Sequence, residues 1–522
     1  MALTKVSGHL QSGATINAAD FGVSASASAS ANTAALQSAL DSLTNGGTLV
    51  ISDDISINGE VQVKYNDITI IGDSKPLITQ TVAGLRVFWG TDVDDITIKS
   101  IRIDGTDSSV AYNGVTLDGN GEGALHFTKS AANIQNIRIY DCEIYNAFTP
   151  ISVTYCGNVW VQNNLIRNFY KFGILVSRSY NFHIDNNNIY TCEYEVAGNN
   201  AYGIMGTGDA SASGDIQQRC SISNNVIDYV RLWDGIMSHD VDDIIITGNH
   251  ITNVRIGVDI SYSSAITSDI QNVIVSDNYI ELTTTDVWGG VAANHSGIHF
   301  IGDNSTPTFI ERGIISNNII KDYNKMTGYT PSGDVVSAIR VNTVKNVSVV
   351  DNVISDMGDA TTAVSPIGVF YPKENVQISG NQITYDLDQD AILVYAADTY
   401  THQNLSVQNN SVFNQDASGV SSKNLLSLNV AGAGGGATCT YSGVVFSGNT
   451  SNFDKKNVYI GSGVTVNYSV SANLFSSAIG MADGITAPAT ITGIAQLYVD
   501  TADGDLKIKF GDGTVKTIVV DT

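Results

Sequence analysis

One short pattern recurs along this chain and limits its fold more than any other feature. Two apolar residues lie two positions apart, an asparagine follows three residues later, and a further apolar residue lies two positions beyond it. Residues two apart face the same side of a β-strand. The last apolar residue is five positions beyond the second, so the chain must bend between them. The clear copies are VWVQNNLI at 159–166, FHIDNNNI at 182–189, CSISNNVI at 220–227, IIITGNHI at 244–251, VIVSDNYI at 273–280, GIISNNII at 313–320, VSVVDNVI at 347–354, VQISGNQI at 376–383 and LSVQNNSV at 405–412.

Weaker copies extend this pattern in both directions. They lie at 444–451 and 468–475, and an earlier copy at 137–144 has Cys142 in the asparagine position. Asparagine tolerates the left-handed backbone conformation that such a bend needs, and we expect the asparagines to take it. Stacked coils would also bring their side chains into a hydrogen-bonded ladder. Its members would be Asn164, Asn187, Asn225, Asn249, Asn278, Asn318, Asn352, Asn381 and Asn410.

The spacing of the asparagines predicts a solenoid. The shortest steps, from Asn164 to Asn187 and from Asn225 to Asn249, are 23 and 24 residues, within the range of repeat proteins. A second strand, often marked by glycine, lies between copies, as in FGILVS at 172–177 and SGIHF at 296–300. Several strands per repeat without a helical period predict a parallel β-helix. A β-sandwich would give no fixed asparagine register, and a propeller would need roughly 40–50 residues per blade.

Composition narrows the class of partner. Only 15% of residues are charged and the formal net charge is −25, which argues against nucleic acid or an anionic membrane as the main partner. No apolar run approaches the roughly 18–20 residues of a membrane span, and the N-terminus has no signal-peptide pattern. The five cysteines are odd in number and form no CxxC, so we expect reduced, mostly buried thiols. No zinc or phosphate-loop motif is present, and we expect neither metal nor cofactor.

The two ends of the chain differ from the repeats. Residues 33–43 predict a helix with Asn32 as N-cap and an apolar stripe that would cover the open end of the core. Residues 476–522 predict a closing β-meander with Asp-Gly turns at 503–504 and 512–513. Asp500, Asp503 and Asp505 lack the spacing of a calcium loop, and turn chemistry explains them better. The expected organisation is a connector over 1–31, a β-helix over 32–475 and the meander over 476–522.

The segment around the expected helix carries a family resemblance. ADFG at 19–22, followed by NTAALQSALDSLTNGGTLVIS at 32–52, resembles the entry segment of the pectate-lyase-like right-handed β-helix family, which is common in phage tailspikes. The usual Gly-Asp-rich link and the Pro-x-Gly-x-Tyr after the first strand are missing, so no catalytic residue carries over. The opening ALTKVSGHL resembles connectors of tail fibre proteins. The resemblance implies a virion-borne homotrimer, attached through its N-terminus to other tail proteins and acting on host-surface polysaccharide outside the cell.

The glycine-marked strands supply candidate catalytic residues. If the residue after glycine points inward, the inward set is Ile236, Val258, Ile298 and Ile339, and the next residue in each strand points outward. Neighbouring coils lie about 4.8 Å apart. Asp259, His299 and Arg340 would then form one exposed ladder, with His239 as a diagonal neighbour of Asp259. Asp234 and Asp240 flank the same strand.

Longer asparagine steps in the middle of the chain predict loops that stand off the coils, where binding residues usually lie. Aromatic residues in or near these loops could stack on sugar rings. The candidates are Trp233, Tyr202, Trp288 and Tyr262. Should the ladder not be the site, Glu193, Glu195 and Asp240 are the next acids to test.

Together these features predict a polysaccharide depolymerase, and its chemistry stays open between two reactions. An endo-acting glycoside hydrolase needs two carboxylates, about 5–5.5 Å apart for retention or about 6.5–9.5 Å apart for inversion, for which Asp234, Asp240 and Asp259 are candidates. A lyase acting on a uronic acid needs a base and a cation, which His299 or His239 could supply with Arg340. The few basic residues favour the hydrolase. A non-catalytic adhesin is the third alternative.

Overall fold

The computed structural model describes residues 13–109, 123–130, 133–192, 201–208, 219–262, 269–281, 296–302, 309–322, 337–358, 365–386, 389–396, 401–415, 423–430, 438–452, 456–462, 464–468, 496–500 and 502–519. The chain divides into two compact units, Met1–Ser471 and Ala472–Thr522. Each unit is described by itself.

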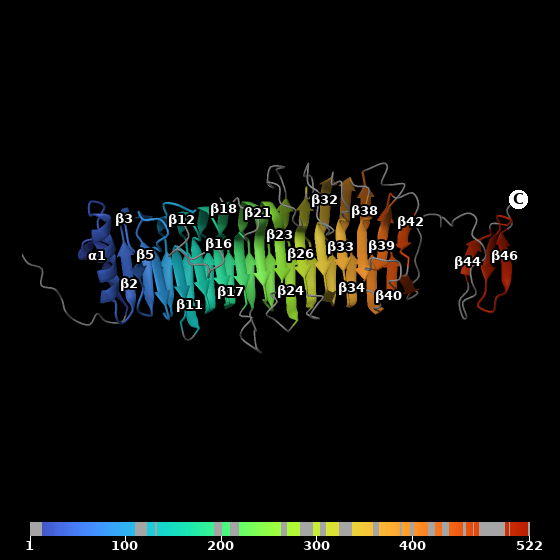
Figure 1. The fold of residues 1–522 in the computed structure, drawn as a ribbon, viewed down its shortest axis with the longest axis horizontal. Helices are drawn as coiled ribbons and strands as arrows, with labels where there is room; N and C mark the ends of the chain where they lie inside the picture. Colours follow the sequence, from blue (N-terminus) through green and yellow to red (C-terminus); the bar gives the residue numbers. More distant parts are fainter. Residues whose placement is uncertain are drawn as a thin grey trace, which may run out of the picture. The chain divides into compact units, whose positions relative to one another are not determined.

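The first unit is a parallel β-helix, as the repeat predicts (Figure 1). A typical coil holds three strands, here β14 (Cys156–Gln162), β15 (Leu165–Phe169) and β16 (Phe172–Ser177). Each pairs in parallel with its counterpart one coil later: β17 (Tyr180–Asp185), β18 (Asn188–Cys192) and β19 (Tyr202–Thr207). Asn164 and Asn187 lie at the corner between the first and second strands, which is where the sequence repeat requires a bend.

The first strands of the coils form one 17-stranded sheet. Besides β14 and β17, its members are β1 (Ala14–Asn17), β2 (Gly47–Ile51), β5 (Ile68–Gly72), β8 (Ile96–Lys99), β11 (Ile134–Tyr140), β20 (Cys220–Ser223), β22 (Ile244–Thr247), β24 (Ile270–Ser276), β27 (Ile310–Ser316), β30 (Val344–Lys345), β31 (Val347–Val350), β34 (Glu374–Ser379), β37 (Thr401–Gln408), β40 (Cys439–Ser447) and β43 (Val464–Tyr468).

The second and third strands together form a 26-stranded sheet. The second-strand row also holds β3 (Ile55–Ile57), β6 (Leu77–Gln80), β9 (Arg102–Asp104), β12 (Glu143–Ala147), β25 (Tyr279–Glu281), β28 (Ile319–Lys321), β32 (Val353–Gly358), β35 (Gln382–Asp386), β38 (Ser411–Asn414) and β41 (Thr450–Ser451). The third-strand row also holds β4 (Val61–Gln62), β7 (Phe88–Thr91), β10 (Leu125–Thr128), β13 (Ile151–Thr154), β26 (Ser296–Ile301), β29 (Ile339–Asn342), β33 (Ile367–Phe370), β36 (Ile392–Ala396), β39 (Asn424–Val430) and β42 (Lys456–Ile460). The long strands β21 (Val226–His239) and β23 (His250–Ser261) run through both rows.

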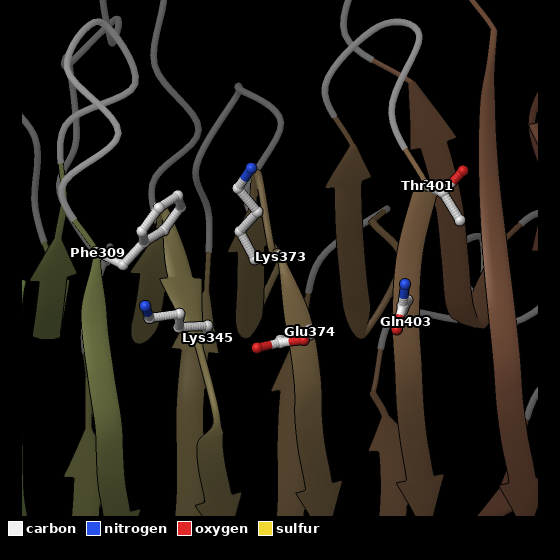
Figure 2. A pocket seen from close by; sticks show the side chains of 6 residues that line it. All are labelled: Phe309, Lys345, Lys373, Glu374, Thr401 and Gln403. Carbon is white, nitrogen blue, oxygen red and sulfur yellow. The ribbon is translucent and has the colours of Figure 1, made fainter.

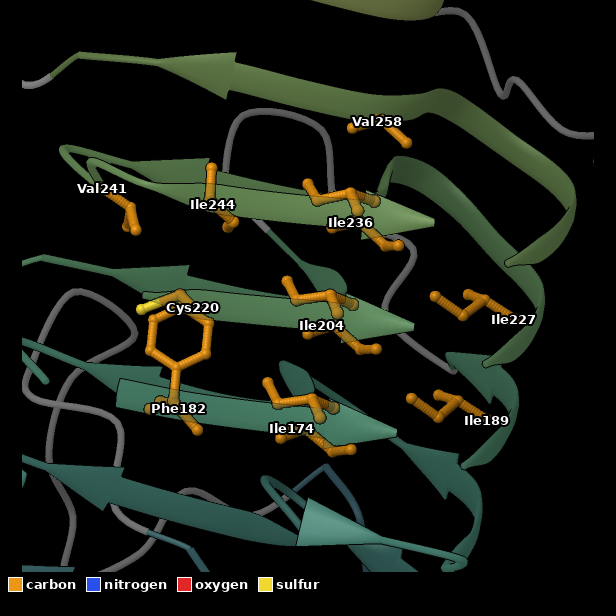
Figure 3. Close-up of a cluster of buried hydrophobic side chains, with 14 of the residues drawn as sticks. Ile174, Phe182, Ile189, Ile204, Cys220, Ile227, Ile236, Val241, Ile244 and Val258 are labelled. Atoms are coloured by element: carbon orange, nitrogen blue, oxygen red, sulfur yellow. The ribbon is translucent and has the colours of Figure 1, made fainter. Parts of the chain in front are cut away.

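The core fills the inside of the coils with stacked aliphatic side chains (Figure 3). Ile204, Ile236 and Val258 stack along the third-strand row, one per coil, and are fully buried. The row of glycines beside them is a packing requirement. A Cβ on Gly235 would lie 2.6 Å from Cγ2 of Ile251, the last apolar residue of its repeat. Glycine therefore lets the second and third strands close on each other at this corner.

The predicted asparagine ladder is present and buried. The side-chain amide of Asn164 donates to Oδ1 of Asn187 at 2.9 Å, and the same bond links each predicted member to the next, up to Asn410. Asn449, in a weaker copy, continues it. Cys142 stands in the asparagine position, and its backbone N–H donates to Asn164 Oδ1 at 3.0 Å.

The expectation that the ladder asparagines take the left-handed conformation is wrong. The left-handed residue is the one before each of them, such as Asn163 (φ 57°), Asp277 (φ 57°) or Gly248 (φ 68°). The sequence accordingly has Asn, Asp or Gly at this preceding position in the nine clear copies, the residue types that adopt this conformation most easily. The ladder asparagine is selected instead for its hydrogen bonds.

The cap helix exists but begins earlier than the sequence analysis predicts. Helix α1 spans Ala29–Ser42, and its N-cap is Ser28, whose hydroxyl accepts from the N–H of Ala31 at 3.2 Å. Asn32, the expected cap, is buried within the helix and donates its amide to the carbonyl of Ser56 at 3.2 Å. The helix packs on β3 and β4 at one end of the stack (Figure 1). Before it, a 3-10 helix covers Ala18–Phe21, and β1 pairs with β2.

The second unit contains the expected meander. Strands β44 (Gln496–Val499), β45 (Leu506–Lys509) and β46 (Val515–Val519) pair antiparallel, and Gly504 and Gly513 have positive φ in the two turns. Lys507 contacts both Asp500 and Asp503 with its ammonium group. These acids are thus paired with a lysine.

Candidate functional site

The predicted ladder of charged side chains has the predicted register. On the third-strand row Asp259 lies opposite His299, and His299 lies opposite Arg340 one coil later. The adjacent residues Val258, Ile298 and Ile339 are fully buried in the core. Because successive side chains of a strand point to opposite faces, Asp259, His299 and Arg340 point away from the core.

The prediction that these three side chains are exposed is wrong. Asp259 is 5% exposed, His299 2% and Arg340 7%. Strand alternation fixes which side of the solenoid wall a side chain occupies, but it does not tell whether that side faces water. The polar row is therefore a buried cluster outside the wall.

An ion pair extends this cluster toward the preceding coils. Arg255 Nη2 lies 3.1 Å from Asp234 Oδ1, and both side chains are buried. The guanidinium also lies over the ring of Trp233, 3.8 Å from its centroid. The sequence analysis identified Asp234 and Trp233 but missed Arg255. Arg255 lies two residues before Gly257, just as Trp233 lies two before Gly235, and that shared offset was the signal that could have revealed it.

Many polar atoms of the cluster lack a partner. Among the described residues, Asp234 Oδ2, Asp259 Oδ1 and both ring nitrogens of His299 are buried without a hydrogen bond; His299 Nδ1 is 3.7 Å from Asp259 Oδ1. The same holds for Arg255 Nε and the hydroxyls of Ser296 and Ser337. Each buried polar group without a partner costs about 1–3 kcal/mol. This concentration of polar atoms without partners makes the cluster the candidate site among the described residues.

Burial and mutual charge shift the titration of the cluster. Burial raises the pKa of Asp234 to about 6, although the charge and hydrogen bond of Arg255 oppose this. Burial, reinforced by the charge of Asp234, raises the pKa of Asp259 well above its usual range. Burial, followed by the charges of Arg340 and Arg255, holds the pKa of His299 well below its usual value. These pKa shifts favour a neutral imidazole at His299 and make Asp234 and Asp259 harder to ionise than ordinary carboxyls.

The structure separates the other two predicted residues from this cluster. His239 lies opposite Ser261 in the register, two residues beyond Asp259, so it is the diagonal neighbour predicted. Its Nδ1 is 2.9 Å from the Ser261 hydroxyl, and burial lowers its pKa to about 4. Asp240 is a left-handed turn residue with φ 59°. It follows Asp234 by six residues, about 20 Å of extended strand, so these two acids cannot act on one bond.

The aromatic candidates form an apolar extension of the cluster. Tyr202 stacks on Phe172 with ring centroids 5.8 Å apart, and Trp233 meets Tyr202 edge-on at 6.3 Å. Met237, opposite Asp259, packs with them. Tyr262 instead packs, partly buried, against the main core. Trp288, Glu193 and Glu195 lie outside the described residues.

A separate open cleft of about 230 Å³ lies near the N-terminal ends of the first strands in later coils (Figure 2). Its lining residues are Phe309, Lys345, Lys373, Glu374, Thr401 and Gln403. None of them was predicted as a site residue.

The described helices include none long and apolar enough to cross a membrane. No group of three or more His, Cys, Asp or Glu among the described residues is arranged to hold a metal ion. All five cysteines are free and buried, as predicted.

Comparison with known proteins supports the architecture. Residues 91–310 match the family model described as a right-handed β-helix region. Similar solved structures include PfbA, a surface adhesin of Streptococcus pneumoniae, with 14% identity over 80% of this chain and 93% of that chain and a TM-score of 0.48. They also include the catalytic unit of a GH87 α-1,3-glucanase from Streptomyces thermodiastaticus strain HF3-3, with 15% identity, coverage of 85% and 69%, and a TM-score of 0.49.

A third similar structure is the tailspike protein of E. coli bacteriophage HK620 in complex with a pentasaccharide, with 14% identity over 82% of this chain and 76% of that chain and a TM-score of 0.45. At these identities the likeness concerns the fold alone. The parallel pairing of the strands and the match to the family model agree on one architecture. The chain folds as a right-handed parallel β-helix.

Proposed function

We propose that this protein binds a polysaccharide and hydrolyses it with Asp234 and Asp259 as the reacting carboxyl pair. The observation that carries the proposal is the burial of both carboxyls, with the charge of Asp234 acting on Asp259, and each carboxyl has one oxygen without a hydrogen-bond partner among the described residues. Two carboxyls in different protonation states are the requirement for cleaving a glycosidic bond. Sugar hydroxyls supply the donors and acceptors that the surrounding orphaned atoms need.

The environments of the two carboxyls assign their roles. Asp259 is the proposed general acid that protonates the leaving glycosidic oxygen, because burial and the charge of Asp234 favour its protonated form. Asp234 is the proposed carboxylate, because the charge and hydrogen bond of Arg255 favour its ionised form. Asp234 then either removes a proton from the attacking water or attacks the anomeric carbon itself. In both cases the product is a new reducing end, and one water is consumed.

Trp233 is the proposed contact for the sugar rings next to the cleaved bond, and Tyr202, only 2% exposed, supports the Trp233 ring edge-on. Their rings continue the outer face of the wall from the carboxyl pair toward earlier coils. Aromatic rings present the large, rigid apolar surface that the apolar face of a sugar ring can cover. Trp288 stays a proposed contact from the sequence alone.

A lyase is the second candidate, and one observation favours it. His299 is a neutral imidazole beside Asp259, and Arg340 lies opposite it on the next coil. A neutral imidazole can remove the proton next to a uronate carboxylate while the guanidinium stabilises the resulting charge. The product would then carry an unsaturated sugar in place of a newly added water.

The resemblance of residues 19–52 to the entry segment of tailspikes supports a location for this activity. We propose a homotrimer on a phage tail, joined to other tail proteins through its N-terminus and acting on the host surface. Mass measurement in solution tests the trimer, and labelling of intact virions with an antibody against the protein tests the location.

The activity test uses purified capsular and O-antigen polysaccharides, with reducing ends and ultraviolet absorbance of unsaturated uronate measured in parallel. We expect new reducing ends without the absorbance. The Asp234→Asn and Asp259→Asn proteins should lose cleavage by roughly 10² or more, whereas Asp386→Asn, on the second-strand row, should cleave normally. Normal rates in both active-site variants would place the chemistry elsewhere. Binding by the parent protein without cleavage of any polysaccharide would make it an adhesin.

A further inference from the structure

We infer that the cleft around Phe309 and Gln403 is a remote subsite that holds one neutral, hydroxyl-rich sugar unit of the same polysaccharide. The inference rests on the proposed function, because it assigns a second contact for the glycan that the carboxyl pair would cut. The carrying observation is a cleft whose size, lining chemistry and position on the coils all fit a sugar ring.

The size of the cleft suits a single unit. About 230 Å³ is below the roughly 300–1,000 Å³ of pockets that hold drug-sized ligands. Successive first strands supply its lining: Phe309 precedes β27, Lys345 lies in β30, Glu374 begins β34, and Thr401 and Gln403 lie in β37. Figure 2 shows these side chains spread over neighbouring strands near the strand ends. The rigid sheet beneath therefore fixes the spacing of the contacts.

The lining offers hydrogen-bond donors and acceptors with little excess charge. Gln403 supplies an amide, Thr401 a hydroxyl, Glu374 a carboxylate acceptor and Lys373 an ammonium donor. Lys345 is held by Asp269 at 2.6 Å and by Glu311 at 3.3 Å. Because acids and lysines alternate around the cleft, it favours a neutral polyol over an anion.

Phe309 adds an apolar element to the same cleft. The ammonium groups of Lys345 and Lys373 lie 5.3 Å and 5.2 Å from its ring centroid. The two ammonium groups contact the ring, which lines the cleft and supplies the apolar side that the carbon face of a sugar needs. A cleft with polar groups on one side and an aromatic ring on the other matches the two kinds of surface on a pyranose.

The cleft belongs to the coils that also carry the polar cluster. Arg340 lies over the ring of Phe370 at 5.2 Å, and Lys373 follows Phe370 by three residues. From Arg340 to Lys345 the chain runs only five residues, at most about 17 Å of extended strand. Asp259 lies two coils before Arg340, about 10 Å along the stack, so a glycan seated at the carboxyl pair reaches the cleft when it spans several sugar units.

The test separates affinity from chemistry with two cleft variants, Gln403→Ala and Lys373→Gln. Loss of binding that is equal in the ground state and the transition state raises KM and leaves kcat unchanged. We expect KM on a cleaved polymer to rise roughly 5–20-fold, as for the loss of one or two hydrogen bonds, with kcat within about twofold. Gln382→Ala and Lys321→Gln, which remove the same residue types from the second-strand row, are the matched controls.

A binding measurement keeps the test independent of turnover. In the Asp259→Asn background, calorimetry with the same polymer should show the same 5–20-fold weakening for the cleft variants and none for the controls. Competition with methyl glucoside and with glucuronate, both millimolar, identifies the class of sugar. Competition by glucuronate alone would overturn the assignment to a neutral unit.

The outcomes distinguish the two proposals. If the parent protein cleaves a polymer and the cleft variants match it in KM and in affinity, the subsite is refuted while the proposed function stands. If the parent protein neither binds nor cleaves any of the polysaccharides, the proposed function fails, and the subsite fails with it.

Discussion

The side-chain amide of Asn249 donates to Oδ1 of Asn278 at 2.9 Å, and the backbone N–H of Asn249 donates to the same oxygen at 3.0 Å. Asn249 Oδ1 in turn accepts both groups of Asn225, and its amide reaches the carbonyl of Ile222 at 3.0 Å. One side chain thus satisfies buried polar groups on three coils.

We expect Asn249→Val to destabilise the solenoid strongly. The substitution removes the acceptor of the Asn225 backbone N–H, one of the two acceptors of the Asn225 amide and the amide donor to the Ile222 carbonyl. Each buried group left unsatisfied costs about 1–3 kcal/mol. A loss of at least about 3 kcal/mol in the free energy of unfolding is therefore expected, measured by denaturant unfolding. Asn188→Val, at an exposed position of β18, is the control and should change stability by less than about 1 kcal/mol. Equal stability of the two variants would mean that the ladder contributes nothing.

The cap helix makes a second prediction about stability. Leu36 is a residue of α1 whose side chain is fully buried and closes the end of the core. Leu36→Ala should cost about 2–5 kcal/mol, as for other large-to-small core substitutions. Removal of residues 1–45 should go further, exposing the core end and causing aggregation.

Ser38→Ala, on the exposed side of the same helix, is the control for the leucine substitution. Light scattering of the truncated protein follows aggregation. A truncated protein that stays monodisperse and unfolds cooperatively would contradict the capping role of this helix.

The raised pKa of Asp259 predicts how stability depends on pH. A carboxyl whose pKa is higher in the folded than in the unfolded state stabilises the fold at low pH, and this contribution is lost as pH rises through the folded pKa. The loss begins above the ordinary carboxyl value of about 4. Asp259→Asn cannot ionise, so its Tm should exceed that of the parent protein at pH 8 and lose this advantage at pH 4.

Asp386→Asn, in β35, should show no such crossing. Thermal unfolding of the three proteins across this pH range is the measurement. Parallel curves for Asp259→Asn and the parent protein would show that Asp259 does not titrate abnormally.

The buried position of His299 predicts the outcome of its replacement. Its ring is 2% exposed, so His299→Ala would leave a cavity, and a substitution that keeps the volume is the better probe. His299→Gln should retain the fold, with a Tm within a few degrees of that of the parent. If the protein is a lyase, this variant should lose cleavage by roughly 10² or more because the base is gone. If it is a hydrolase, cleavage should fall by less than Asp259→Asn lowers it, and no unsaturated product should appear in either protein.

The sequence predicts most of the fold because each copy of the repeat folds into a coil of the same geometry. The pairing of Asp259 with His299 and of His299 with Arg340 follows from aligning glycine-marked strands, since a parallel sheet keeps that alignment from coil to coil. Arg255 was missed because only the residues after each glycine were aligned; it lies two residues before Gly257, in a corner where the register shifts between Val230 and Asp234. The alignment could not foresee burial either, because the shielding of an outward side chain depends on segments distant in the sequence. The N-cap was assigned to Asn32 in error because Ser28 and Asn32 are both good N-cap residues. In the structure the Asn32 amide donates to the carbonyl of Ser56 instead.

The asparagine ladder also bears on how such a molecule changes length. Its bonds have nearly the same length whether 23 residues separate two members, as for Asn164 and Asn187, or 40, as for Asn278 and Asn318. The geometry of the ladder therefore depends on the stacking of the coils and not on the number of residues between two asparagines. Residues can be inserted between two asparagines without disturbing the corner where the ladder lies. A longer or shorter solenoid, in contrast, requires the gain or loss of a complete coil together with its own asparagine. Sequence variation on the outer face can therefore come from the residues between the asparagines, while the ladder keeps the stacking of the coils constant.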